Sequence, residues 1–190
     1  MLARYFMYSQ VYFHPVRRIY DVHLMDFLRE QLAGGVFPTD LSLHLGTTDN
    51  EITAALFTAA FDEAKPGHLH ARRIVRREHF KVLYDRNPKD VEINPEAGKA
   101  VFDAVGSEFG GDDFRHDRYH QASGAPDFPV RRRDGEIMSS LAISETLNKV
   151  PVVSIDYVFA NRSILAQAGE WVRLHHTEIV KPKPEEGENG

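Results

Sequence analysis

The sequence has no cysteine and a single tryptophan among its 190 residues. Without cysteine, the chain has no disulfide, no thiol nucleophile and no thiolate metal ligand. It also lacks an excess of basic charge, because 23 Lys and Arg stand against 28 Asp and Glu, for a formal net charge of -5. Dedicated nucleic-acid and membrane-surface proteins are normally basic. We therefore expect neither nucleic acid nor a membrane as a partner.

Long hydrophobic runs are missing as well. No stretch approaches the roughly 18 apolar residues that a membrane span requires, and the apolar N-terminus is interrupted by Arg4, Ser9 and Gln10. No targeting segment is recognisable, so we expect a cytoplasmic protein. With 42% hydrophobic and 27% charged residues, the composition is ordinary for a globular protein of one domain or a tight pair.

Common catalytic motifs are absent too. The sequence has neither a Gly-rich phosphate-binding loop nor a Gly-x-Ser-x-Gly turn. His116-Asp117 looks like a metal-ligand dipeptide, but glycine and polar residues around it favour a loop or an edge strand. His68-x-His70 and His175-His176 lack a third ligand at fixed spacing, and we interpret them as surface histidines. The sequence thus predicts no catalytic residue and no metal ligand in this chain.

Hydrophobic periodicity predicts helical structure over residues 2–32, where Ile19, His23 and Phe27 recur at helical spacing. Pro15 interrupts this pattern, because proline inside a helix removes a backbone hydrogen bond. A kink or a new helix start is expected there. A second helix is expected to begin near Asp49, a plausible N-cap.

After Lys65-Pro66-Gly67 the pattern changes from helical to mixed. The expected elements are a basic helix over 68–79, a strand over 80–84, a helix after Asn94-Pro95-Glu96, a hairpin around Asp134-Gly135, a buried strand over 152–159 and a short helix over 163–168. This predicts an α+β fold, in which an N-terminal helical segment precedes a smaller mixed α/β subdomain with antiparallel strands. The expected divisions are a helical segment at 1–65, an α+β subdomain at 66–180 and a disordered tail at 181–190.

Three polar residues in the apolar N-terminal region recur at a spacing of four: Gln10, His14 and Arg18. A continuous helix would place them on one face. Amide, imidazole and guanidinium groups on one stripe suit an anion. The alternative is a core helix whose polar residues find local partners.

The N-terminal string Ala-Arg-Tyr-Phe-Met-Tyr-Ser-Gln-Val-Tyr-Phe-His, from Ala3 to His14, resembles a helix of HD-superfamily phosphohydrolases, the bacterial relatives of deoxynucleoside triphosphate triphosphohydrolases. The resemblance extends to about Phe159 and includes Tyr84-Asp-Arg-Asn-Pro88 and Phe128-Pro-Val130. In that family the helix follows the core that holds divalent metal. The resemblance therefore implies a C-terminal region that lacks the metal-binding HD core, with no cofactor in this chain and divalent metal in the complete enzyme. Whether the chain is itself an enzyme stays open.

The resemblance also assigns site residues. It implies that Gln10, His14 and Arg18 lie near the phosphates and sugar of the substrate, although many bacterial relatives have Lys where this chain has Pro15. Arg77-Glu-His-Phe-Lys81 resembles a segment of nucleotide-regulated relatives, so Arg77 and Lys81 are the expected contacts to a regulatory nucleotide at a subunit interface. Without the resemblance, the basic residues would be interpreted as a solvated face.

Two functional hypotheses follow. In the first, the chain is the C-terminal region of an HD-type (deoxy)nucleoside triphosphate phosphohydrolase that contributes substrate-phosphate contacts, oligomerisation and nucleotide sensing. A nucleotide or another phosphate anion and a second copy of the chain, in a homo-oligomer, are then the expected partners. In the second, it is a free-standing, non-catalytic interaction module that docks through the apolar face of residues 2–28.

Overall fold

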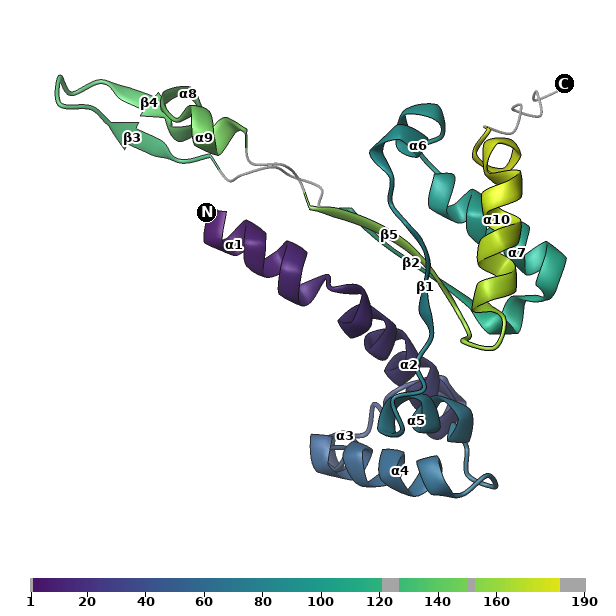
Figure 1. The fold of residues 1–190 in the computed structure, drawn as a ribbon. Helices are drawn as coiled ribbons and strands as arrows, with labels where there is room; N and C mark the ends of the chain where they lie inside the picture. Colours follow the sequence, from purple (N-terminus) through teal and green to yellow (C-terminus); the bar gives the residue numbers. More distant parts are fainter. Residues whose placement is uncertain (1, 121–126, 150–152, 182–190) are drawn as a thin grey trace, which may run out of the picture.

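The computed structural model describes residues 2–120, 127–149 and 153–181 (Figure 1). The fold is α+β, as the sequence predicts. It has a helical N-terminal part, a three-stranded antiparallel sheet with helices on both faces, and a separate two-stranded hairpin.

Helix formation restarts at Pro15. Helix α1 (Leu2–Met7) continues into a π-helical turn, η1 (Tyr8–Tyr12), and the chain then leaves helical geometry at His14 before α2 (Pro15–Gln31). Proline is well suited to the first helical position, where its missing N–H would have no intrahelical partner. His14 caps α2, because its Nδ1 accepts a hydrogen bond from the Val16 N–H at 3.2 Å. Of the two outcomes expected at Pro15, the structure has the new start.

The remaining helices of the N-terminal part are η2 (Ala33–Gly35), α3 (Leu41–Gly46), α4 (Asp49–Phe61) and α5 (His68–Val75). Of these, α4 and α5 pack around Phe27 of α2. Thr48 and Glu51 form a capping box at the start of α4. The buried Phe27 contacts small residues of α4 and α5. Gly67, with φ 73°, precedes α5 at a point where a Cβ would lie 2.5 Å from the Phe27 ring, so both the backbone and the contact require glycine.

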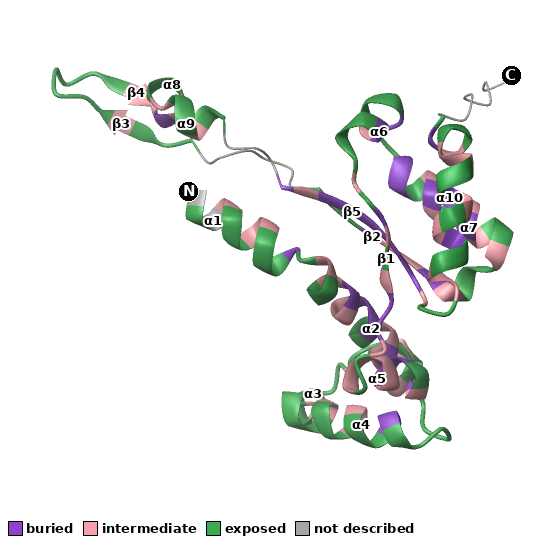
Figure 2. Ribbon diagram, in the orientation of Figure 1, coloured by how far each residue is buried: buried purple, intermediate pink, exposed green. Residues whose placement is uncertain are grey.

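The sheet has the order β1-β5-β2, with β5 (Ser154–Ala160) between β1 (Lys81–Asp85) and β2 (Phe114–His120). Both pairings are antiparallel. Successive side chains of a strand point to opposite faces, and β5 uses both. Val158 and Ala160 join the core formed with α7 (Ala97–Phe109) and α10 (Leu165–Val180), while Tyr157 and Phe159 join the core formed with η1 and α2. Figure 2 shows β5 as a buried strand.

Six shorter elements complete this region and form the hairpin. Helix α6 (Pro88–Ile93) follows β1, and η3 (Gly111–Asp113) leads into β2. The hairpin pairs β3 (Pro129–Arg131) with β4 (Ile137–Ser139) and is followed by α8 (Ser140–Ile143) and α9 (Glu145–Asn148). It extends away from the sheet in Figure 1. Gly135, with φ 88°, lies in its turn, as the Asp134-Gly135 signal predicts.

Two helices differ in length from their predictions. The basic helix expected over 68–79 ends at Val75, and the helix expected over 163–168 runs from Leu165 to Val180. Most of the predicted tail, residues 182–190, and the predicted strand start at Val152 lie outside the described residues. The division of the chain at residues 65 and 66 stays a prediction. Within the described residues, no helix is both long enough and apolar enough to cross a bilayer.

Candidate functional site

The three residues of the N-terminal stripe do not share one continuous helical face. Gln10 lies on η1 and is exposed, His14 caps α2 from an exposed position, and Arg18 lies in the first turn of α2. The stripe is broken because His14, with φ -58° and ψ 131°, is not helical. The structure thus brings His14 and Arg18 to the start of α2 and leaves Gln10 on a separate turn.

Arg18 is held by an aspartate of the sheet. Its Nε and Nη2 donate to the two carboxylate oxygens of Asp117 at 2.6 and 2.5 Å. This bidentate geometry is the strongest form of an arginine–carboxylate pair. The hydrogen bond from Arg18 to Asp117 raises the pKa of the guanidinium. The positive charge of Arg18 is therefore largely compensated within the chain, 99 residues away in sequence.

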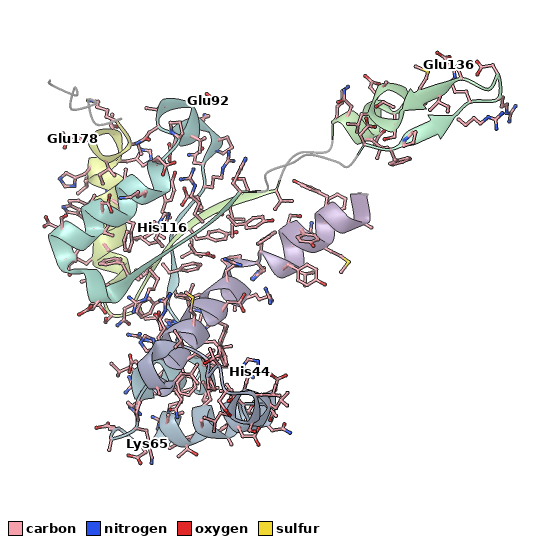
Figure 3. The ribbon with its side chains drawn as sticks, turned by 180° about the vertical axis from the view of Figure 1, so that it is seen from behind. His44, Lys65, Glu92, His116, Glu136 and Glu178 are labelled. Carbon is pink, nitrogen blue, oxygen red and sulfur yellow. The ribbon has the colours of Figure 1, made fainter. Side chains whose placement is uncertain are left out.

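The His116-Asp117 dipeptide lies on the edge strand β2, one of the two placements that the sequence predicts. Adjacent residues of a strand face opposite sides of the sheet. His116 stacks on Phe102 of α7 and its Nε2 lies 2.7 Å from Oδ1 of Asp156, whereas Asp117 binds Arg18 of α2. Figure 3 labels His116 in the sheet region. Because each side chain is engaged on its own side, the dipeptide does not fit the divalent metal of the HD family.

A pocket of about 430 Å³ opens where α2 meets β2 and α7. Its charged lining consists of three arginines, one histidine and three aspartates: Arg18, Arg29, Arg115, His116, Asp21, Asp26 and Asp117. Arg115 donates a hydrogen bond to Asp26 at 2.8 Å, so it is paired with an aspartate as Arg18 is with Asp117. The pocket is large enough for a small polar ligand, which would compete with these ion pairs for the guanidinium groups.

The two residues of the second predicted site, Arg77 and Lys81, follow the end of α5. Arg77 lies beyond the helix in a left-handed conformation, with φ 57°, and Lys81 is the first residue of β1. The predicted basic helix over 68–79 therefore ends before Arg77 and contains neither Arg77 nor Lys81. Another cation, Arg162, lies at this site, where it donates a hydrogen bond to the Arg77 carbonyl oxygen at 3.1 Å. Sequence reasoning missed Arg162, which is 85 residues from Arg77.

Cations also surround His79 at this site. The Lys81 Nζ lies 3.1 Å from the His79 Nε2. Burial lowers the pKa of His79, and the positive charges of Lys81 and Arg162 lower it further. A concentration of positive charge such as this one favours the binding of an anion.

Two histidines interpreted as surface residues have structural partners. His70 of α5 is 7% exposed and lies beside His23 and Asp26 of α2. The Nε2 of His176 lies 3.0 Å from the buried Asp90. The interpretation is therefore wrong for His70. The sequence signal that could have identified it was the His23-x-x-Asp26 spacing on the predicted buried face of the first long helix.

Comparisons with known proteins show the fold. No family model matches the chain, and no curated protein matches it. A crystal structure of a hypothetical protein from Aquifex aeolicus matches 89% of this chain with a TM-score of 0.72 and 25% sequence identity. A crystal structure of a phosphohydrolase from Bacteroides thetaiotaomicron matches 85% of it with a TM-score of 0.55 and 18% identity. The matches cover 42% and 48% of those chains, so this chain spans less than half of each and shares its fold with part of a solved phosphohydrolase.

Proposed function

We propose that the chain is the C-terminal region of an HD-type (deoxy)nucleoside triphosphate phosphohydrolase. In this role it contributes contacts to the substrate phosphates, surfaces for oligomerisation and a site that senses a nucleotide. The observation that carries the proposal is the likeness to a phosphohydrolase over 85% of this chain but 48% of that one. The resemblance of the N-terminal segment to the helix that follows the HD core also supports the proposal.

The start of α2 is suited to a phosphate. Helix N-termini attract anions through their free N–H groups and the positive end of the helix dipole. The first turn of α2 has no acidic residue. Because Nδ1 of His14 accepts from Val16, the neutral ring carries its proton on Nε2, which can donate to a phosphate oxygen. Arg18, held by Asp117, positions this turn against β2.

The test is a binding titration of the chain with a deoxynucleoside triphosphate, in which equilibrium dialysis measures the bound ligand. His14→Ala is expected to weaken binding by about 10–150-fold, because a hydrogen bond to a charged group contributes roughly 1.5–3 kcal/mol. His44→Ala is the matched control, since His44 is an exposed histidine on α3. Equal affinity of the His14 variant and the native chain would contradict the phosphate contact.

The sensing role rests on Arg77, Lys81 and Arg162. Charge reversal in the double variant Arg77→Glu/Lys81→Glu is expected to abolish nucleotide-dependent assembly, as measured by analytical ultracentrifugation. The double variant Arg132→Glu/Arg133→Glu makes the same charge change near the exposed turn of the hairpin and is expected to assemble normally. Unchanged assembly in the first variant would remove sensing from the proposal.

A second candidate function is a free-standing, non-catalytic interaction module. Large apolar side chains are exposed along the helical part: Phe6, Met7, Val11, Tyr12, Leu41, Leu43, Leu45, Phe57 and Phe61. Exposed apolar patches mark surfaces that associate with other protein. Concentration-dependent self-association without nucleotide binding would favour this function over the first.

A further inference from the structure

Two histidines and an aspartate meet where α2 and α5 pack together. His23 and Asp26 lie about one turn apart on α2, and His70 belongs to α5. One ligand atom of each residue lies within 4.8 Å of the other two. His23 is completely buried and His70 nearly so. The cluster is separate from the His14 and Arg77 sites, and its function does not depend on the phosphohydrolase proposal.

The His70 ring is oriented by a carboxylate. Its Nε2 lies 3.2 Å from Oε1 of Glu30. The Nη1 donor of Arg73 lies 3.5 Å from Nδ1, so we place the ring proton of His70 on Nε2, toward Glu30. The Nδ1 lone pair then faces Oδ2 of Asp26 at 3.7 Å, with no proton between the two atoms. Metal-binding histidines typically donate their outer N–H to a carboxylate in this way.

His23 has a ring nitrogen without a hydrogen-bond partner. Its Nε2 accepts from the Phe80 N–H at 3.3 Å, whereas its buried Nδ1 has no partner among the described residues. Leaving a buried polar atom unsatisfied costs roughly 1–3 kcal/mol. His23 belongs to the same cluster as His70 and Asp26, because one of its ring nitrogens lies within 4.8 Å of their ligand atoms.

Neighbouring arginines limit which cation can bind. Asp26 accepts from Arg115 at 2.8 Å, and Arg73 lies 3.5 Å from Nδ1 of His70. Coordination through Nδ1 of His23 would also move the ring proton to Nε2 and give up the long hydrogen bond from Phe80. A weakly bound cation could not offset these costs. The site therefore favours a metal with high affinity for imidazole. Magnesium and calcium prefer oxygen ligands, whereas zinc and related transition metals accept imidazole.

We propose that His23, Asp26 and His70 form a binding site for a divalent transition-metal ion, with zinc the best match. Two imidazoles and one carboxylate leave a fourth position for water in tetrahedral geometry. The ion ties α2 to α5, directly before the segment that leads to Arg77 and Lys81. Glu30 is a positioning residue, because it contacts the ring of His70 and orients it.

The test is metal binding by the whole chain after removal of metal with a chelator. Co²⁺ is added first, since its visible absorption reports nitrogen ligands and geometry, and Zn²⁺ is then titrated in competition with a chromogenic chelator. One ion per chain is expected. His70→Gln and Asp26→Asn are expected to abolish the site. Glu30→Gln is expected to weaken binding by about 10–100-fold, the usual range for an outer-shell partner.

Two variants serve as matched controls. Glu63→Gln removes an acid that lines the same surface pocket as Glu30, and His68→Gln removes the neighbouring histidine of α5. Both are expected to bind zinc like the native chain. Circular dichroism checks folding, and the Glu30 side chain is 54% exposed, so Glu30→Gln remains decisive if the buried variants unfold. Absence of a saturable one-to-one site, or equal affinity of Glu30→Gln and Glu63→Gln, would overturn the proposal.

Discussion

The sheet region buries most of its apolar side chains, whereas the helical N-terminal part exposes many of them. In the sheet region, β5 is buried on both faces, with Val158 against α7 and α10 and Phe159 against α2. In the helical part, α3 exposes Leu41, Leu43 and Leu45. Figure 2 shows this contrast as a purple β5 and largely green α3 and α4.

The difference indicates which region buries its own apolar faces without a further partner. A sheet with helices on both faces satisfies the requirement that each apolar face be buried against another element. Helix α4 packs against α5 and α2, and both α3 and α4 expose large apolar side chains. Such a surface is typical of one that meets additional protein. This agrees with the proposal that the chain is part of a larger hydrolase, and it also suits an interaction module.

The largest expected effect on this contrast comes from replacing one phenylalanine in each region with alanine. Phe159→Ala is expected to lower the free energy of unfolding by about 3–5 kcal/mol, because Phe159 is 0% exposed. Phe61→Ala, at a side chain that is 66% exposed, is expected to change it by less than about 0.5 kcal/mol. Urea unfolding followed by circular dichroism measures both. Similar losses in the two variants would show that the helical part has a core of its own around Phe61.

The second effect is the pH dependence of the helical part. The pKa of His23 is lowered from 6.5 to about 3, because burial disfavours the charged ring. Between these values the unfolded chain binds a proton that the folded chain does not, so stability falls as the pH falls from about 6.5 to about 3. The loss attributable to His23 between pH 7 and pH 4 is about 3 kcal/mol.

This pH effect is measured as the difference between two proteins. Urea unfolding of the native chain and of His23→Gln, both with a chelator present, is compared at pH 7 and pH 4. Carboxylates that titrate in both proteins largely cancel in the difference. The native chain should lose more stability than the variant, and parallel losses would refute a buried neutral His23.

Two glycines of α7 provide a smaller and sharper test within the sheet region. A Cβ on Gly98 would lie 2.0 Å from Oδ1 of Asp156, which is buried, whereas a Cβ on Gly106 would have no heavy atom within 4 Å. Gly98→Ala is expected to destabilise the chain by about 1–3 kcal/mol through overpacking. Gly106→Ala is expected to stabilise it by about 0.5–1 kcal/mol through helix propensity. Thermal unfolding of the two variants should therefore shift in opposite directions.

The smallest effect on stability is expected for the exposed apolar surface. The double variant Leu43→Ser/Phe57→Ser should leave the unfolding free energy within about 1 kcal/mol of the native value. It should reduce concentration-dependent association, as measured by sedimentation. Unchanged association would show that this surface is not an interface between copies of the chain.

Local signals in the sequence predicted much of the sheet region. Asp134-Gly135 predicted the hairpin, and the run before Phe159 predicted the buried strand, because turn chemistry and unbroken apolar patterns are local properties. Pro15 likewise marked the new helix. The end of α5 was missed, since a left-handed conformation at Arg77, a residue other than glycine, leaves no signal in the sequence.

The site residues were less predictable than the fold. Arg18, His14 and Gln10 could be named from their spacing, but the pairing of Arg18 with Asp117 spans 99 residues and depends on how β2 packs against α2. The meeting of His23 with His70 depends on contact between α2 and α5. Single-sequence periodicity places a residue on a face but does not identify what covers that face.

The most direct test of the central claim is one measurement of bound deoxynucleoside triphosphate and of released phosphate or triphosphate in the same sample of this chain, with divalent metal added. The account predicts saturable binding that His14→Ala weakens, without turnover, because His116 and Asp117 are engaged on opposite faces of the sheet. Rapid release of phosphate or triphosphate by the native chain, or no binding at concentrations that saturate a phosphohydrolase, would contradict it.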